Sequence, residues 1–149
     1  MQKRLWPLLA AAVVIIVLLL YPSTQCHVTG ADLTMSPPKV FVIPVEEGYA
    51  VGFSFNVTNR ASCGINAQKI RVVLSGLVYA DGRQVAQSSE ETETVGGTIA
   101  SGQSGSFTYT FGSYFQFRPA KLLLKVEMTF AETGPVLVFD GDLPVSAQI

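Results

Sequence analysis

The sequence is poor in the side chains that most enzymes use for chemistry. It has one histidine, His27, and two cysteines, Cys26 and Cys63, and only 14% of its residues are charged. A cysteine nucleophile needs a base nearby, and the single histidine lies in a polar segment far from Cys63 in the chain. No carboxylate pair is embedded in an apolar run, where burial would raise its pKa. We therefore expect no enzymatic activity and no cofactor.

A basic surplus and a complete phosphate loop are also absent. Beyond residue 25 the chain carries 8 Lys and Arg against 11 Asp and Glu, so a nucleic-acid partner is not expected. The segment "GTIASGQS" at 97–104 has the glycine spacing of a phosphate loop, but Gln103 stands where the lysine must be. A strand pattern follows it instead of a helix, and we interpret it as a turn between strands.

One long apolar run is present, from Leu5 to Tyr21, directly after Lys3 and Arg4. A membrane-spanning helix needs roughly 17–25 residues, whereas the core of a signal peptide needs about 7–15. The small residues that signal peptidase prefers are not paired after this run, which favours an uncleaved anchor over a signal peptide. The positive charges before the run hold the N-terminus in the cytoplasm. We expect a single-pass protein of the cytoplasmic membrane, anchored in lipid, with its C-terminal domain outside the cytoplasm.

The chain after the anchor divides into two parts. Residues 22–38 are polar and rich in proline, and we interpret them as a linker. Residues 39–149 alternate between apolar and polar side chains with period two, which predicts strands with one buried face. The clearest example is "KLLLKVEMTF" at 121–130. In "KIRVVLSGLVYA" at 69–80 the expected buried set is Ile70, Val72, Leu74 and Val78, and in "YAVGFSFNVT" at 49–58 it is Val51, Phe53, Phe55 and Val57.

Turn signals separate these strands. "ADGRQ" at 80–84 is typical of an Asp-Gly hairpin, and "ETGP" at 132–135 is expected to join the last two strands. No helical periodicity and no internal repeat follow Tyr21. The sequence therefore predicts an all-β domain, an antiparallel β-sandwich of two sheets, preceded by one N-terminal transmembrane helix.

The two cysteines allow two interpretations. Outside the cytoplasm an even pair usually forms a disulfide, and closing the loop from Cys26 to Cys63 would contribute about 4 kcal/mol in the chain-entropy model. The alternative is a small metal or redox protein that uses Cys26, His27 and Cys63. This set is short of ligands, because structural zinc needs four and blue copper needs two histidines. We prefer the disulfide.

Three further features are candidates for surface roles. Asn56 begins an Asn-x-Thr sequon, a glycosylation signal in exported chains, although it lies inside a predicted strand. The acidic pairs Glu46 and Glu47, Glu90 and Glu91, and Asp140 and Asp142 would bind a divalent cation only if they met at one end of the sandwich. The segment "FTYTFGSYFQF" at 107–117 is dense in aromatic residues, and we expect Tyr114 and Phe115 to contact a partner.

The order of these features resembles the late-embryogenesis-abundant proteins of the second class and the related WHy (water stress and hypersensitive response) domain. "VGFSFNVTNRASCGI" is similar to the opening strand of that family, with Asn59 at the first Asn of its Asn-Pro-Asn motif and Arg60 in place of the proline. "GTIASGQS" matches its later turn at Gly97, Ile99, Gly102 and Ser104, with Ala100 where proline is usual. The resemblance covers residues 40–145 and includes no catalytic residues.

The resemblance implies a small sandwich of immunoglobulin or fibronectin type III style on a membrane anchor. It also implies a protective or binding role at membranes or proteins under stress. Our leading expectation is accordingly a non-catalytic interaction or stress-protective module of the cell envelope, with a protein partner there. The first alternative is an accessory structural subunit of a surface filament or secretion machine that docks through an edge strand. The second is the metal or redox protein.

Overall fold

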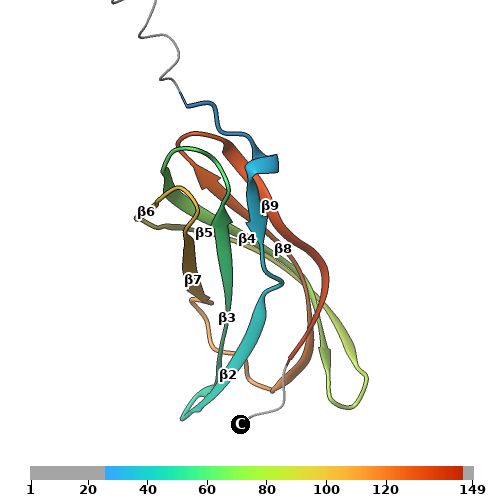
Figure 1. Ribbon diagram of the computed structural model, residues 1–149. Coiled ribbons are helices and arrows are strands. Elements are labelled where there is room, and N and C mark those ends of the chain that lie inside the picture. The colour runs from blue at the N-terminus through green and yellow to red at the C-terminus, as the bar shows by residue number, and fades with distance from the viewer. Residues whose placement is uncertain (1–25, 146–149) are drawn as a thin grey trace, which may run out of the picture.

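The alternating segments form the strands of two antiparallel sheets in the computed structural model, which describes residues 26–145 (Figure 1). The first sheet contains β1 (Leu33–Met35), β2 (Lys39–Val45), β3 (Gly48–Asn59) and β7 (Ser104–Thr110). The second contains β4 (Ile65–Tyr79), β5 (Gln84–Thr94), β6 (Thr98–Ile99), β8 (Pro119–Phe130) and β9 (Gly134–Pro144). A 3-10 turn, η3 (Gly30–Asp32), precedes β1. The predicted all-β fold of two antiparallel sheets is confirmed.

The strand order gives the two sheets different widths. In the first sheet β3 is central, with β1 and β2 following one another along one of its sides and β7 along the other. In the second sheet the order is β5-β4-β8-β9, and the short β6 pairs with the beginning of β4. A bridge between Val40 and Val145 brings the β2 edge next to the end of β9, which closes one side of the sandwich.

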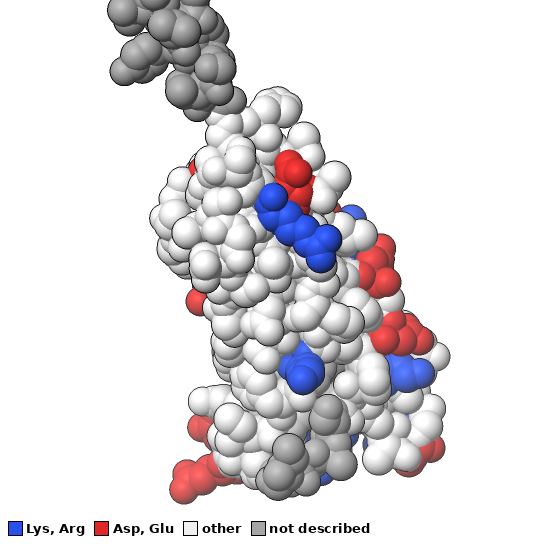
Figure 2. Space-filling model, in the orientation of Figure 1, with Lys and Arg blue, Asp and Glu red and all other residues white. Residues whose placement is uncertain are grey.

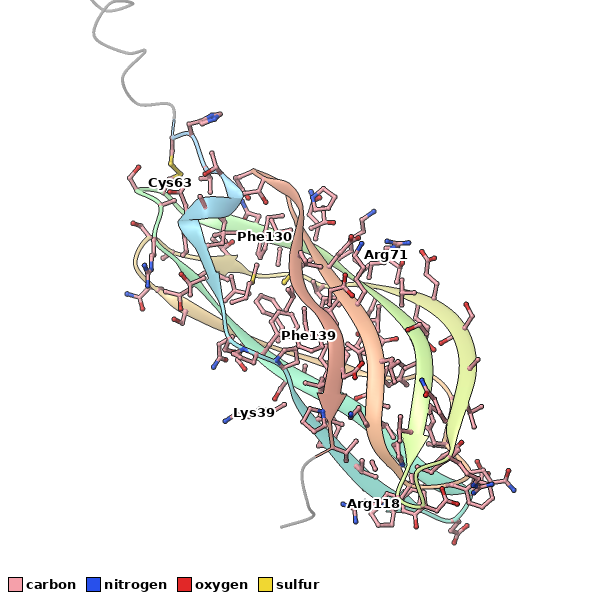
Figure 3. The ribbon with its side chains drawn as sticks, turned by 90° about the vertical axis from the view of Figure 1, so that its right-hand side faces the viewer. Lys39, Cys63, Arg71, Arg118, Phe130 and Phe139 are labelled. Carbon is pink, nitrogen blue, oxygen red and sulfur yellow. A yellow bond between two sulfur atoms is a disulfide. The ribbon has the colours of Figure 1, made fainter. Side chains whose placement is uncertain are left out.

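The core lies between the sheets and is built from the alternating apolar positions. Phe130 and Phe139 point between the layers in the side view, whereas Arg71 points away from them (Figure 3). In β8 every second residue from Leu122 to Phe130 is buried, as the sequence predicts. The expected buried set of β3 is also confirmed: Val51, Phe53, Phe55 and Val57 are all at most 2% exposed.

Both predicted hairpins are present. Gly82 lies in the β4–β5 turn with φ of +85°, and Gly134 lies at the β8–β9 turn with φ of +73°. These are left-handed conformations that glycine adopts without a steric cost. The segment 97–104 is a turn that leads from β6 into β7, as expected.

One part of the β4 prediction was wrong. The pairing of β4 with both neighbours shifts register between Leu74 and Gly76, which marks a β-bulge. A bulge adds one residue to one strand and reverses the in-out alternation beyond it. Leu77 is therefore fully buried, and Val78, expected in the core, is only partly buried.

The predicted linker is partly folded. Val28 and Leu33 are buried in the core, and β1 pairs with the end of β3, so the chain joins the sandwich well before residue 39. These apolar residues are too isolated in the sequence to show a period. The predicted anchor at residues 5–21 lies outside the described residues. Within residues 26–145 no helix is long and apolar enough to cross a membrane.

Candidate functional site

The two cysteines are joined at the end of the sandwich where the described chain begins. Cys26 and Cys63 form a disulfide with a Cα–Cα distance of 5.9 Å, so the predicted pair is present. The bond attaches the N-terminal segment to the β3–β4 connection (Figure 3). His27 is exposed beside it. With both sulfur atoms in this bond, neither is a thiolate that could serve as a metal ligand. Among residues 26–145 no three His, Cys, Asp or Glu side chains are grouped to hold a metal ion.

A buried amide organises the loops at the same end. Asn59 is fully buried; its Nδ2 donates to the carbonyl oxygens of Cys63 at 2.8 Å and Ile99 at 3.0 Å, and its Oδ1 accepts from the backbone N–H of Ala61 at 3.0 Å. One side chain therefore fixes both the cysteine loop and the 97–104 turn. We did not predict this role, although the alternation of β3 does place residue 59 on the core face.

The opposite end of the sandwich exposes aromatic side chains. We define the distal tip as Tyr79, Arg83, Tyr114 and Phe117. Tyr114 is 57% and Phe117 49% exposed. The guanidinium carbon of Arg83 lies 5.5 Å from the ring centroid of Tyr79 and 5.9 Å from that of Phe117, within cation–π range.

The Arg83 side chain is held in place from its other side. Its Nε donates to Asp81 at 2.6 Å, and the backbone N–H of Arg83 donates to the same carboxylate at 3.0 Å. The backbone hydrogen bond and the guanidinium keep the pKa of Asp81 below its usual value. Tyr79, Arg83 and Phe117 are therefore an ordered group of two rings and one cation. Tyr114, from the same loop as Phe117, borders a groove with Ser89 and Glu91.

The distal tip lies far from the disulfide. Cys63 lies two residues before β4 begins, and Tyr79 is the last residue of β4. The 15 residues of this strand extend over about 50 Å. Figure 3 likewise places Cys63 and Arg118 at opposite ends. A chain that enters at the disulfide end thus presents the tip at the far end.

The predicted contact pair, Tyr114 and Phe115, is divided between surface and core. Phe115 is only 8% exposed, its ring meets Phe111 edge-on at 5.6 Å, and its backbone bridges to Tyr49. Its assignment as a partner contact is therefore corrected, because a buried ring has too little surface to offer. Tyr114 and Phe117 are the exposed aromatic residues of this loop.

The acidic pairs do not converge at one end. Glu46 and Glu47 lie at the β2–β3 turn, and Asp140 and Asp142 lie along β9. The latter two border an open groove of about 380 Å³ whose floor includes Val73 and Leu123. Lys121 lies 3.8 Å from Asp142 beside this groove.

Glu90 belongs to a row of ion pairs on the outer face of the second sheet. Arg71 contacts Glu90 at 2.6 Å and Glu127 at 3.0 Å, and Lys125 contacts Glu127 at 3.0 Å. The Arg71 hydrogen bond lowers the pKa of Glu90, and the Lys125 and Arg71 hydrogen bonds lower that of Glu127. We interpret this row as a solvated surface.

Glu91, by contrast, points to the core side of β5. It pairs with the buried Val72, accepts a hydrogen bond from the hydroxyl of Tyr109 on β7, and accepts another from Gly112 N at 3.3 Å. Burial, and then the hydrogen bond between the Tyr109 hydroxyl and Glu91, raise the pKa of Tyr109 well above its ordinary value. A carboxylate is thus held at the side of the sandwich where β5 and β7 are the edge strands.

Asn56, the residue of the sequon, lies exposed in the middle of β3. Its backbone is paired on both sides, with Ser106 of β7 on one and with Ser36 on the other. The side chain faces outward on the first sheet, but the strand is not an edge strand.

Comparisons with known proteins concern the fold only. No family model matches the chain, and no curated protein matches it. An X-ray structure of the structural-genomics target SoR45 is similar at 10% identity and a TM-score of 0.50, covering 79% of this chain and 89% of that one. The putative ApaA protein of Bordetella pertussis is similar at 14% identity and a TM-score of 0.47, covering 77% and 93%. The sandwich architecture is therefore shared with a solved structure.

Proposed function

We propose that the protein is a non-catalytic interaction module of the cell envelope. Residues 5–21 would anchor it in the cytoplasmic membrane, and its sandwich, of immunoglobulin or fibronectin type III style, would lie outside the cytoplasm. The single observation that supports this role is the position of the distal tip. Tyrosine, phenylalanine and arginine are enriched at protein interfaces, and tyrosine and arginine are among the side chains that dominate binding energy there. They lie at the end away from the disulfide, where an anchored domain would present them to a partner.

The resemblance to the WHy domain fits this role, because it implies contact with proteins or membranes without catalysis. The same resemblance also supports a second version of the proposal, in which the module protects membranes or proteins under stress. Both versions require surface contact at the tip and predict that changes there reduce binding while the fold is kept.

The test uses the full chain in detergent micelles. Replacing Tyr114 and Phe117 together by serine should leave the β-type circular dichroism spectrum and the melting temperature nearly unchanged, because both rings are exposed. Binding to proteins or vesicles prepared from the native membrane should fall about tenfold or more. Replacing Phe115 by serine is the matched control for a buried ring, and it should lower stability by about 3–5 kcal/mol. Unchanged binding by the Tyr114 and Phe117 variant would remove the tip from the proposal.

A second candidate is an accessory structural subunit of a surface filament or secretion machine. One observation favours it: β7 is an edge strand of seven residues without a charge, a proline or a register shift. Such an edge can pair with a strand of another protein.

A further inference from the structure

The unequal widths of the two sheets leave one strand position of the sandwich open. Where β7 pairs with β3, from Gly52 to Thr58, the first sheet is at most three strands wide, with β1 or β2, then β3, then β7, while the second is four strands wide. The bridge between Val40 and Val145 aligns β2 with β9 on one side. The surplus strand is therefore β5 on the other side. Within residues 26–145 no strand covers the core-facing side of β5 next to β7. The loop at 111–115 covers that side only near Ser89 and Glu91, so the part nearer Glu93 is open.

The core-facing side chains in the later half of β5 are polar, as expected where no strand packs against them. Ser89, Glu91 and Glu93 pair with Leu74, Val72 and Ile70, whose side chains are buried, so all three point to the core side. They are nevertheless polar, and Glu93 is exposed. A strand packed beneath another strand would carry apolar residues at these positions. The position beside β7 is thus faced by two carboxylates, of which Glu91 already accepts hydrogen bonds from Tyr109 and Gly112, while Glu93 is exposed.

The free edge of β7 offers a regular row of backbone groups. Phe111 N donates to Val51 O at 2.9 Å, and hydrogen-bonded pairs in an antiparallel ladder recur every two residues. The odd-numbered residues of β7 therefore bond to β3. The N–H and C=O groups of Ser106, Thr108 and Thr110 point away from it, and within the described chain no backbone partner meets them.

The other edges of the two sheets carry features that oppose pairing. β2 contains Lys39 and Pro44, and β9 contains prolines, aspartates and a register shift. β5 carries Glu90, Glu91 and Glu93, and β1 has only three residues. Charges, prolines, bulges and short length are the usual protections of an edge strand. β7 has none of them. Figure 2 shows the neighbouring face, over β2, β3 and β7, as a broad and nearly uncharged area.

We propose that β7 binds an extended segment of a partner protein as a fourth strand of the first sheet. The segment lies over β5 and carries Lys or Arg at alternate positions, which face Glu91 and Glu93. This inference rests on the proposed interaction role and adds the chemistry of the partner. About seven residues match the length of β7, and the polar face of the segment continues the hydroxyl-rich outer face of the sheet.

Charge and distance both suit a basic segment. Packed sheets lie about 10 Å apart, a gap that a lysine from one layer and a glutamate from the other can span. An ion pair formed there would be partly shielded from water and would contribute more than one on an open surface. Apolar side chains at these positions would instead leave the two carboxylates without a cation.

A second copy of this chain does not fit the same position. If two β7 edges paired antiparallel, the second sheets of both copies would lie on the same side. Because each β5 extends one strand beyond its own β7, it would occupy the space of the other copy's β4. The position therefore accepts a single strand without a second layer beneath it. A flexible segment of another protein meets this condition.

The test combines peptide selection with two matched pairs of variants. The probe is a displayed library of random eight-residue peptides, selected on the full chain in detergent micelles. Thr108→Pro removes one outward N–H of β7 without breaking a bond to β3, and Thr92→Pro does the same on the β5 edge. Glu93→Lys reverses one charge facing the open position, and Glu47→Lys makes the same change at the β2–β3 turn.

Selected peptides should carry Lys or Arg at every second position. Their affinity should fall about tenfold or more for Thr108→Pro and for Glu93→Lys, and remain within about twofold for the two controls. Three results would overturn the inference: no enriched peptide, enriched peptides without basic alternation, or equal affinity for Thr108→Pro. Dimers of the wild type that Thr108→Pro abolishes would also contradict it. If binding depends on Phe117 but not on Thr108, the interaction role stands and only the strand site fails.

Discussion

The amide of Asn59 is a buried polar group that holds the cysteine loop and the 97–104 turn, and its removal should be costly. Asn59→Ala deletes three hydrogen bonds, to Cys63 O, Ile99 O and Ala61 N. At about 1 kcal/mol for each bond, we expect a loss of about 3 kcal/mol in the free energy of unfolding. For a domain of this size, such a loss lowers the melting temperature by about 10 °C.

A second substitution separates hydrogen bonding from volume. Asn59→Asp keeps the size of the side chain and the acceptor for Ala61 N, but it replaces the two N–H donors by an oxygen that faces two carbonyl oxygens. We expect it to destabilise at least as much as Asn59→Ala. The control is Asn56→Ala, an exposed position on the same strand, which should change stability by less than about 0.5 kcal/mol. Thermal unfolding followed by circular dichroism measures all three. Wild-type stability in Asn59→Asp would refute the argument.

Three further outcomes follow from the same contacts. Replacing Cys26 and Cys63 by serine should lower the melting temperature without abolishing folding. The loss in the free energy of unfolding, measured by thermal unfolding, should be at most about 4 kcal/mol. Because the pKa of Tyr109 is raised in the folded state, its contribution to stability is complete below about pH 10 and declines above it. Tyr109→Phe should therefore show a smaller alkaline loss in melting temperature than the wild type, and equal losses would contradict this. Because Arg71 lowers the pKa of Glu90, Arg71→Met should weaken the decline in stability as the pH falls through about 4.5, and an unchanged acid profile would argue against the ion pair.

The regular strands could be predicted because their burial follows a simple period. In β8 every second residue from Leu122 onward is apolar and buried, and the turns at Gly82 and Gly134 carry residues that suit their backbone angles. Val78 could not be placed, because the bulge near Gly76 reverses the alternation without changing the composition of the strand. Leu33 could not be recognised as a core residue, because three residues of β1 are too few to show a period.

The candidate sites were harder to predict than the fold. A loop has no period, so the sequence did not indicate that Tyr114 is exposed and Phe115 buried. The open position beside β7 depends on how many strands each sheet contains, which is a property of the whole topology. Glu91 could be distinguished from Glu90 only once the register of β5 against β4 was known.

The central claim is that the domain works by surface contact at its distal tip, and crosslinking in living cells tests it most directly. A photoreactive phenylalanine derivative placed at Tyr114 of the full chain should, on illumination, join the protein to a discrete partner of the cell envelope. The same group placed at Thr129, on the outer face of β8, should give no such product. Equal products at both positions, or none at Tyr114 when the protein is folded in the membrane, would contradict the proposed function.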